Sequence, residues 1–296
     1  MVGWCKERTA AVESYLRLLL EGLAAEPACL VTVESTQGSV PRESGAWMAV
    51  FAGRLVGTIG GGHLEHQAIA EARRRLADPG AANDPAPMRF ALGPALGQCC
   101  GGVVFLEFEC VAAQNAPALA RRLTADLHPV ALFGGGHVGH ALARVLAPLP
   151  FALTWIDSRD GIFPDAPPPN VHCEHSEPVQ MAVPLLAPGS RVLIMSFSHA
   201  EDLDVVAACL KRQRERGDLP FIGLIGSKTK WATFTSRLTA RGFSPRELAR
   251  VTCPLGVPCI PGKEPEVIAV AVAAQLLQSV AAVQVAAIPQ QGYSQA

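Results

Sequence analysis

The chain has 296 residues, a formal net charge of −1, and 49% hydrophobic against 17% charged residues. This length predicts about two domains, each large enough to bury its own core. The nearly neutral charge lacks the basic excess of nucleic-acid-binding proteins, so we expect no nucleic-acid partner.

Targeting signals, membrane spans and disulfides are also not expected. The first residues, Met1 to Arg8, do not resemble a signal peptide. The apolar stretch from Val267 to Ile288 is mostly alanine and valine with glutamine and serine interspersed, which predicts a packed helix and no membrane span. The nine cysteines are odd in number and irregularly spaced, which favours free thiols and a reducing, cytoplasmic location.

The first part of the chain predicts an α/β domain over residues 1–114, because helical and strand-like apolar patterns alternate there. Arg42 and Glu43 lie on a loop in this part. They are interpreted as a solvated surface pair, and the alternative is that they contact a ligand. The expected elements are a helix with its apolar stripe at Val12 to Leu23, a strand at Cys29–Val33, a hairpin at Trp47–Phe51 and Leu55–Ile59, a helix after Gly62, and a strand at Val103–Phe108.

Three consecutive glycines, Gly60, Gly61 and Gly62, come directly before the second predicted helix. The N-terminus of a helix exposes unpaired N–H groups, so this turn is a candidate anion site with His63 in its first helical turn. The alternative is a turn that needs glycine only for its positive φ angles.

Two neighbouring cysteines, Cys99 and Cys100, are flanked by Gly97-Gln98 and by Gly101-Gly102. A core position would have apolar neighbours, whereas these glycines expose the thiols. Thiolates are soft metal ligands and nucleophiles, and amide-rich turns lower their pKa. We therefore interpret Gln98, Cys99 and Cys100 as a functional segment.

The second part, residues 115–296, predicts a Rossmann-like parallel-sheet domain. A buried strand at Val130–Phe133 leads into a G-x-G-x-x-G motif formed by Gly134, Gly136 and Gly139, followed by a helical pattern. A second apolar run then ends in Asp157. Strand, loop, helix, strand and acid in this order are typical of a dinucleotide-type βαβ unit, in which the acid bonds a ribose hydroxyl. The alternatives are a purely structural glycine turn and an acid that caps the sheet edge.

Polar residues follow two further buried strands of this domain. Val192–Met195 is followed by His199 and Asp202 and by a helix through Lys211, and Phe221–Ile225 is followed by Ser227 and Lys228. Since the carboxyl ends of parallel strands form one rim, we expect His199, Asp202, Ser227 and Lys228 to share it. Each of them can instead be a helix cap or a surface charge.

Six segments in one order carry a family resemblance: Gly60–Glu65, Gly97–Gly102, Phe133–Gly139, Ser198-His199, Gly223–Lys230 and Gly262–Pro265. Together they resemble the xanthine dehydrogenase accessory (XdhC/CoxI) family from about Leu16 to Leu277. One departure is Pro258–Pro261, where the family has glycines, and it leaves the shape of this loop open.

The resemblance implies a chaperone that binds the molybdenum cofactor, a pterin dithiolene with a phosphate. It protects the cofactor during sulfuration and inserts it into a xanthine dehydrogenase-type molybdoenzyme of purine metabolism. The implied partners are that enzyme and a cysteine desulfurase-type sulfur donor, and we expect a homo-oligomeric accessory factor without turnover. From the residues and the resemblance together, the candidate cofactor-binding positions are Gly60, Gly61, Gly62, His63, Gln98, Cys99, Cys100, Gly134, Gly136, Gly139, Asp157, His199, Ser227 and Lys228, with Cys99 and Cys100 as candidate metal ligands.

Two alternatives remain from the residues. An NAD(P)-dependent oxidoreductase fits the glycine loop and Asp157. However, the two tyrosines, Tyr15 and Tyr293, are not near the nucleotide-type domain, so no tyrosine–lysine hydride-transfer pair forms there. The second alternative is a docking scaffold between a sulfur donor and the target enzyme, whose glycine loops bind nothing.

Overall fold

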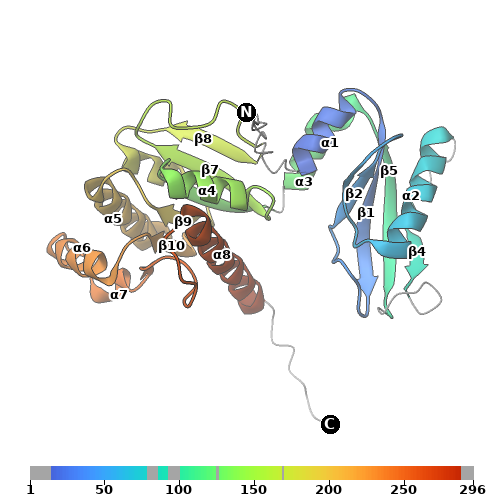
Figure 1. The fold of residues 1–296 in the computed structure, drawn as a ribbon. Helices are drawn as coiled ribbons and strands as arrows, with labels where there is room; N and C mark the ends of the chain where they lie inside the picture. Colours follow the sequence, from blue (N-terminus) through green and yellow to red (C-terminus); the bar gives the residue numbers. More distant parts are fainter. Residues whose placement is uncertain (1–14, 79–85, 93–100, 125–126, 169, 288–296) are drawn as a thin grey trace, which may run out of the picture. The chain divides into compact units, whose positions relative to one another are not determined.

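The computed structural model describes residues 15–78, 86–92, 101–124, 127–168 and 170–287 (Figure 1). The chain divides into two compact units at residues 125 and 126, which we call the N-terminal and C-terminal domains and describe separately. The sequence placed this division at residue 114. The difference arises from α3 (Ala116–Thr124), which contacts α1 (Tyr15–Leu23) and buries Leu119 in the N-terminal domain.

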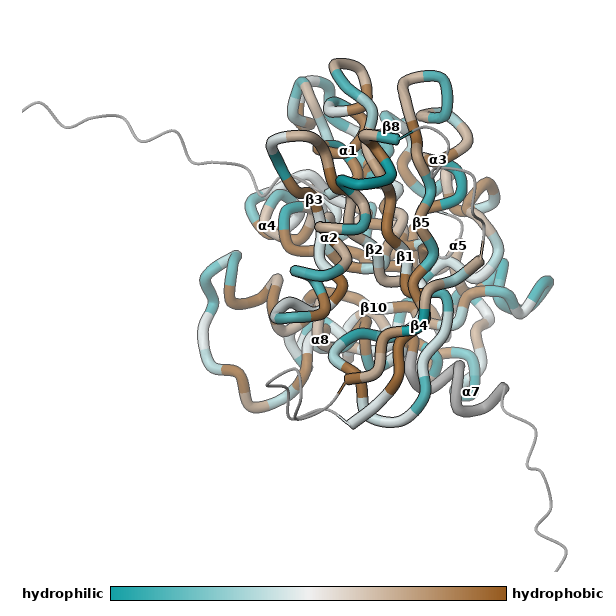
Figure 2. The backbone as a smooth tube through the Cα atoms, turned by 90° about the vertical axis from the view of Figure 1, so that its right-hand side faces the viewer, coloured by the Kyte–Doolittle hydropathy of each residue, from teal (hydrophilic) through white to brown (hydrophobic). Residues whose placement is uncertain are grey.

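The N-terminal domain is built on a five-stranded antiparallel sheet in the order β3-β2-β1-β5-β4. Helix α2 (Gly62–Ala77) covers one face, and α1 and α3 cover the other (Figure 1). Apolar residues follow β1 and β5 at the centre of this sheet (Figure 2). The strands are β1 (Ala28–Gln37), β2 (Trp47–Val50), β3 (Leu55–Gly57), β4 (Met88–Ala91) and β5 (Val103–Val111), and a 3-10 turn, η3 (Ala113–Asn115), precedes α3.

The C-terminal domain is built on a six-stranded parallel sheet in the order β11-β10-β9-β6-β7-β8. The strands are β6 (His128–Phe133), β7 (Phe151–Asp157), β8 (Val171–His175), β9 (Arg191–Ile194), β10 (Phe221–Leu224) and β11 (Val251–Thr252). The chain leaves β6 in one direction through β7 and β8, then returns to β9 on the other side of β6. This reversal is the topological switch point at which open α/β sheets bind ligands.

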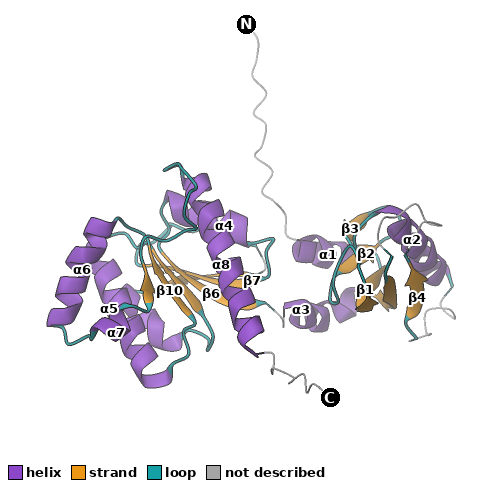
Figure 3. Ribbon diagram, turned by 90° about the horizontal axis from the view of Figure 1, so that it is seen from below, coloured by secondary structure: helices purple, strands orange, loops and turns teal. Residues whose placement is uncertain are grey.

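Helices cover both faces of the parallel sheet (Figure 3). Residues Ala131 and Phe133 of β6 pack toward the face of α5, while Val130 and Leu132 pack toward α4 and α8. The helical elements are α4 (His137–Leu146), η4 (Val179–Leu185), α5 (His199–Arg216), α6 (Lys228–Ala240), α7 (Pro245–Leu248) and α8 (Pro265–Ala287).

The structure confirms the expected α/β class and the Rossmann-like parallel sheet, and it adds elements that the sequence did not predict. β4 and β8 are edge strands with half-exposed residues, so they lack the buried apolar run that identified the central strands. Helix α5 continues past Lys211 to Arg216, because Arg212 is buried and bonds Asp218 and the Val183 carbonyl. It ends where Gly217 adopts a left-handed conformation with φ of 66°.

The apolar C-terminal stretch forms helix α8, which packs on α4 through Ala269, Val272 and Leu276, as expected for a packed helix. Within the part of the chain that the structure describes, no helix combines the length and apolarity needed to cross a membrane. The six cysteines in the described ranges are free thiols: Cys29, Cys110, Cys173, Cys209, Cys253 and Cys259.

Candidate functional site

The three glycines of the G-x-G-x-x-G motif have three different surroundings. A Cβ on Gly134, which has φ of +123°, would overlap the Met195 carbonyl on β9. A Cβ on Gly139 would overlap the Gly134 carbonyl, so this glycine lets α4 pack tightly on the loop. Gly136 has no heavy atom within 4 Å of its Cβ position, which leaves an open approach to the backbone. This is the division of roles in dinucleotide-binding loops, where the second glycine admits the phosphate.

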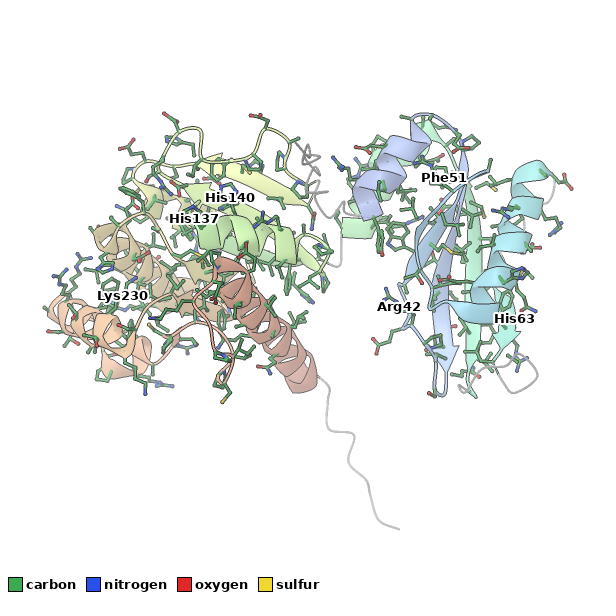
Figure 4. All side chains as sticks on the ribbon, viewed as in Figure 1. Arg42, Phe51, His63, His137, His140 and Lys230 are labelled. Atoms are coloured by element: carbon green, nitrogen blue, oxygen red, sulfur yellow. The ribbon has the colours of Figure 1, made fainter. Side chains whose placement is uncertain are left out.

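Two hydrogen bonds connect the glycine loop to β7. The Gly134 N–H donates to the Ile156 carbonyl at 2.8 Å, and the Trp155 indole Nε1 donates to the Gly134 carbonyl at 3.0 Å. The His140 ring stands edge-on to Trp155 at 4.8 Å between ring centroids. Figure 4 shows His137 and His140 on α4, directly after the loop. The loop is therefore fixed before any ligand arrives.

Asp157, at the end of β7, is buried and already engaged. Its carboxylate accepts hydrogen bonds from the Gly135 N–H at 2.5 Å, from the Arg159 N–H at 2.9 Å, and from the Arg159 guanidinium at 2.9 Å. Burial alone would raise the pKa of Asp157, but the bonds from Arg159 and Gly135 outweigh it and hold this pKa below its usual value. Asp157 thus anchors the glycine loop, and a ribose hydroxyl would have to compete with Arg159 for it.

The loops that follow β7 and β9, at the switch point of the sheet, carry polar atoms, two of which have no hydrogen-bond partner. The Ser158 hydroxyl donates to Glu201 Oε1 at 2.6 Å, which links the loop after β7 to the first turn of α5. Glu201 Oε2 and Ser196 Oγ are buried without a hydrogen-bond partner. At the same end of β9, Phe197 is 67% exposed and carries the Arg159 guanidinium 4.7 Å above its ring centroid.

The residues expected on the strand rim fall into two groups. Asp202 is buried, and its Oδ2 lies 2.6 Å from the Lys230 ammonium, which also donates to the Ile225 carbonyl at 2.8 Å. Burial raises the pKa of Asp202, although the bonds and charge of Lys230 oppose the rise. Lys230 is labelled in Figure 4, in the first turn of α6.

The other rim residues lie at helix starts. Ser227 caps α6 by accepting a hydrogen bond from the Lys230 N–H at 3.1 Å. Lys228 and His199 are exposed first residues of α6 and α5. The sequence-based prediction selected Lys228, whereas the structure places Lys230 in the ion pair. The prediction did not include Ser196, Glu201 or Arg159.

The glycine turn of the N-terminal domain is a second helix N-terminus without a side-chain cap. Gly60, Gly61 and Gly62 have φ angles of 121°, 79° and 67°, so the left-handed backbone itself requires glycine there. The Glu65 carboxylate folds back on this turn and accepts from the Ile59 N–H at 2.9 Å and from the Thr58 hydroxyl.

Arg42 lies beside this turn, because a Cβ on Gly60 would stand 3.3 Å from Arg42 Cγ. Arg42 and Glu43 are both exposed, as expected for solvated surface residues. His63 and His66 are exposed in the first turns of α2, with ring centroids 6.3 Å apart. Figure 4 labels Arg42 on the loop before β2 and His63 at the start of α2.

Gln98, Cys99 and Cys100 lie outside the described residues, but the residues on either side of their segment are placed. The Leu92 N–H donates to the Gly102 carbonyl at 2.8 Å, and the Gly102 N–H donates to the Ser39 carbonyl at 3.1 Å. Ser39 is three residues before Arg42. The described residues on either side of the cysteine segment, Leu92 and Gly102, therefore lie at the end of the sheet near Arg42 and the glycine turn. Across the described ranges, no three His, Cys, Asp or Glu side chains form a group that could hold a metal.

Two protein-family models and one relative match this chain. The family model for the XdhC Rossmann domain matches residues 130–276, and the model for the XdhC and CoxI family matches residues 23–83. The uncharacterized protein YqeB of Escherichia coli (strain K12) is 27% identical over 255 residues, which are 85% of this chain and 43% of YqeB. The chain thus spans less than half the length of that relative.

A solved structure has the same fold over most of the chain. It is the crystal structure of a protein from Bacillus halodurans that is described as a xanthine dehydrogenase. The TM-score is 0.68 at 20% identity, and the match covers 93% of this chain and 98% of that chain. At this identity the similarity shows the fold alone.

Proposed function

Because the chain belongs to the XdhC and CoxI family, we propose that it is an accessory protein that supplies a xanthine dehydrogenase-type enzyme with molybdenum cofactor. In this role it holds the cofactor while a cysteine desulfurase-type donor provides the terminal sulfur, and then transfers it. Family membership supports the accessory role, and the arrangement of the N-terminal domain supports the cofactor as its cargo.

One observation carries this proposal: an anion site and the ends of the cysteine segment lie together. The glycine turn before α2 offers uncapped N–H groups, and Arg42 adds a positive charge beside Gly60. These groups suit the phosphate of the cofactor, with His63 as an additional exposed donor. Gly102, just after the segment that carries Cys99 and Cys100, donates its N–H to the carbonyl of Ser39, which is close to Arg42 in the chain. Leu92, just before that segment, donates to the Gly102 carbonyl. Thiolates suit the soft molybdenum–sulfur part, which supplies the redox chemistry of the finished enzyme.

The test is the cofactor content of the protein purified from molybdenum-supplied cells. We expect bound pterin and molybdenum in the parent and a large loss of both in the Cys99→Ala/Cys100→Ala variant. Cys259→Ala is the matched control, because Cys259 is exposed and lies in the other domain. Full retention of molybdenum by the double variant would refute the role of the two thiols.

A second measurement follows the target enzyme in a strain that lacks this protein. We expect the xanthine dehydrogenase-type enzyme to be made and assembled, but with little active cofactor. The parent gene should restore its activity and the cysteine double variant should not. A fully loaded and active enzyme in the deletion strain would contradict the accessory function.

A further inference from the structure

We propose that the crevice between β6 and β9 of the C-terminal domain binds a pyrophosphate-linked nucleotide with an unphosphorylated ribose, of the ADP-ribose or NAD type. This site lies outside the domain to which we assign the molybdenum cofactor. Its ligand is a second one, and the proposal does not depend on the accessory function.

The phosphate position is defined by the open side of Gly136. Gly136 is the N-cap of α4 and has no side chain that caps the first-turn N–H groups, which have no acceptor within the helix. A side chain at Gly134 or Gly139 would collide with backbone, whereas the Cβ position of Gly136 faces empty space. The backbone can therefore be approached by a diphosphate at this glycine.

A second and independent observation is the pair of unsatisfied atoms in the crevice wall. Buried polar atoms almost always have a partner, yet Ser196 Oγ and Glu201 Oε2 have none. Ser196 directly follows Met195, whose carbonyl lies against Gly134, so this wall adjoins the glycine loop. A ribose diol supplies the missing partners, since its hydroxyls donate to a carboxylate and bond a serine hydroxyl.

Glu201 thus takes the place that Asp157 holds in ordinary dinucleotide sites. The Asp157 carboxylate is saturated by Arg159 and Gly135, while Glu201 has one oxygen without a donor. Neither unsatisfied atom is open to solvent, so the ribose reaches Glu201 by displacing the Ser158 hydroxyl.

The side chains at the mouth of the crevice determine where the base stacks and whether the ribose can carry a 2′-phosphate. Phe197 stays 67% exposed beneath the Arg159 guanidinium and offers a ring on which a planar base can stack. The carboxylates of Asp157 and Glu201 together outweigh the single positive charge of Arg159. A 2′-phosphate would therefore be repelled, so NADH and ADP-ribose are favoured over NADPH.

The experiment is calorimetric titration of the full chain with ADP-ribose, NADH and NADPH. We expect saturable binding of ADP-ribose and NADH, and weaker binding of NADPH. Gly136→Val should weaken ADP-ribose binding by more than about tenfold, because the branched side chain blocks the phosphate. Gly53→Val is the matched control, since Gly53 also has open space around its Cβ and needs no positive φ. It should bind like the parent.

Two crevice variants separate binding from a purely structural role. Glu201→Gln should weaken ADP-ribose binding about tenfold, while Glu215→Gln, exposed at the other end of α5, should not. Ser196→Ala should leave the melting temperature of the ligand-free protein unchanged or higher, because it removes an unsatisfied hydroxyl, and should still weaken ADP-ribose binding.

Three results would overturn the proposal. One is the absence of saturable binding of both ADP-ribose and NADH at millimolar concentration. Another is unchanged ADP-ribose affinity in Gly136→Val or in Glu201→Gln. The third is NADPH binding as tight as that of NADH, which removes the assignment of an unphosphorylated ribose.

Discussion

Replacing Lys230 by methionine leaves the buried carboxylate of Asp202 without its counter-ion while keeping most of the side-chain volume. The Asp202 side chain is 3% exposed and that of Lys230 is 12% exposed, so water cannot hydrate the carboxylate once the ammonium is removed. Breaking a buried pair from one side costs about 3–5 kcal/mol of unfolding free energy.

The loss of unfolding free energy in Lys230→Met has an upper limit that depends on pH, because Asp202 can become neutral by taking up a proton. From its ordinary pKa of 3.8, neutralising this acid costs about 4 kcal/mol at pH 7 and about 1.6 kcal/mol at pH 5. We therefore expect Lys230→Met to lose about 3 kcal/mol at pH 7 and no more than about 1.6 kcal/mol through this charge at pH 5. An acid whose pKa is raised in the folded protein binds an extra proton on folding, so lowering the pH stabilises the variant relative to the parent.

The assay is urea-induced unfolding of the full chain at the two pH values. Lys211→Met is the control for loss of a lysine, since Lys211 is exposed on α5. The double variant Asp202→Asn/Lys230→Met should recover stability at pH 7 relative to Lys230→Met, because it has no buried charge. A penalty that is equal or larger at pH 5, or a double variant no more stable than the single one, would refute the reasoning.

Three further predictions test the fold. Gly139→Ala should destabilise the protein strongly, by about 3 kcal/mol or more in urea unfolding, because its Cβ overlaps the Gly134 carbonyl; a near-neutral change would contradict the tight packing of α4. Leu276→Ala, on the fully buried face of α8, should cost about 3 kcal/mol, and Leu277→Ala, 39% exposed on the same helix, less than about 0.5 kcal/mol; equal losses would contradict the orientation of α8. Glu71 is held by hydrogen bonds from Arg74 and Arg75 that lower its pKa to about 2, so its contribution to stability is present above pH 4.5 and is lost as the pH falls toward 2. In melting temperatures measured against pH, Glu71→Gln should flatten this dependence, and an unchanged slope would exclude the ion pair as its source.

The central strands and the glycine loop were predictable from the sequence because their signals are local. Val130–Phe133 is a continuous apolar run, and the motif beginning at Gly134 follows it at once. The edge strand β8 carries Glu174 and His175 in a half-exposed pattern that no periodicity reveals. Sheet edges have one neighbour and little burial, so their sequences are weakly constrained.

The site was only partly predictable because its pairs form across the fold. Asp202 and Lys230 are 28 residues apart, and Ser158 and Glu201 are 43 residues apart. Only the sheet topology brings them together. Proximity to a strand end led instead to Lys228, which is exposed on α6. The predicted roles of Cys99 and Cys100 stay predictions.

Trp155 gives the C-terminal domain an optical reporter at the glycine loop. Its indole is 1% exposed and donates to the Gly134 carbonyl, with the His140 and Phe163 rings at its edges. Fluorescence from a ring so shielded is emitted toward the blue. A reduced nicotinamide bound nearby would accept this emission by energy transfer. The same indole can therefore record loop occupancy in real time, without any attached dye.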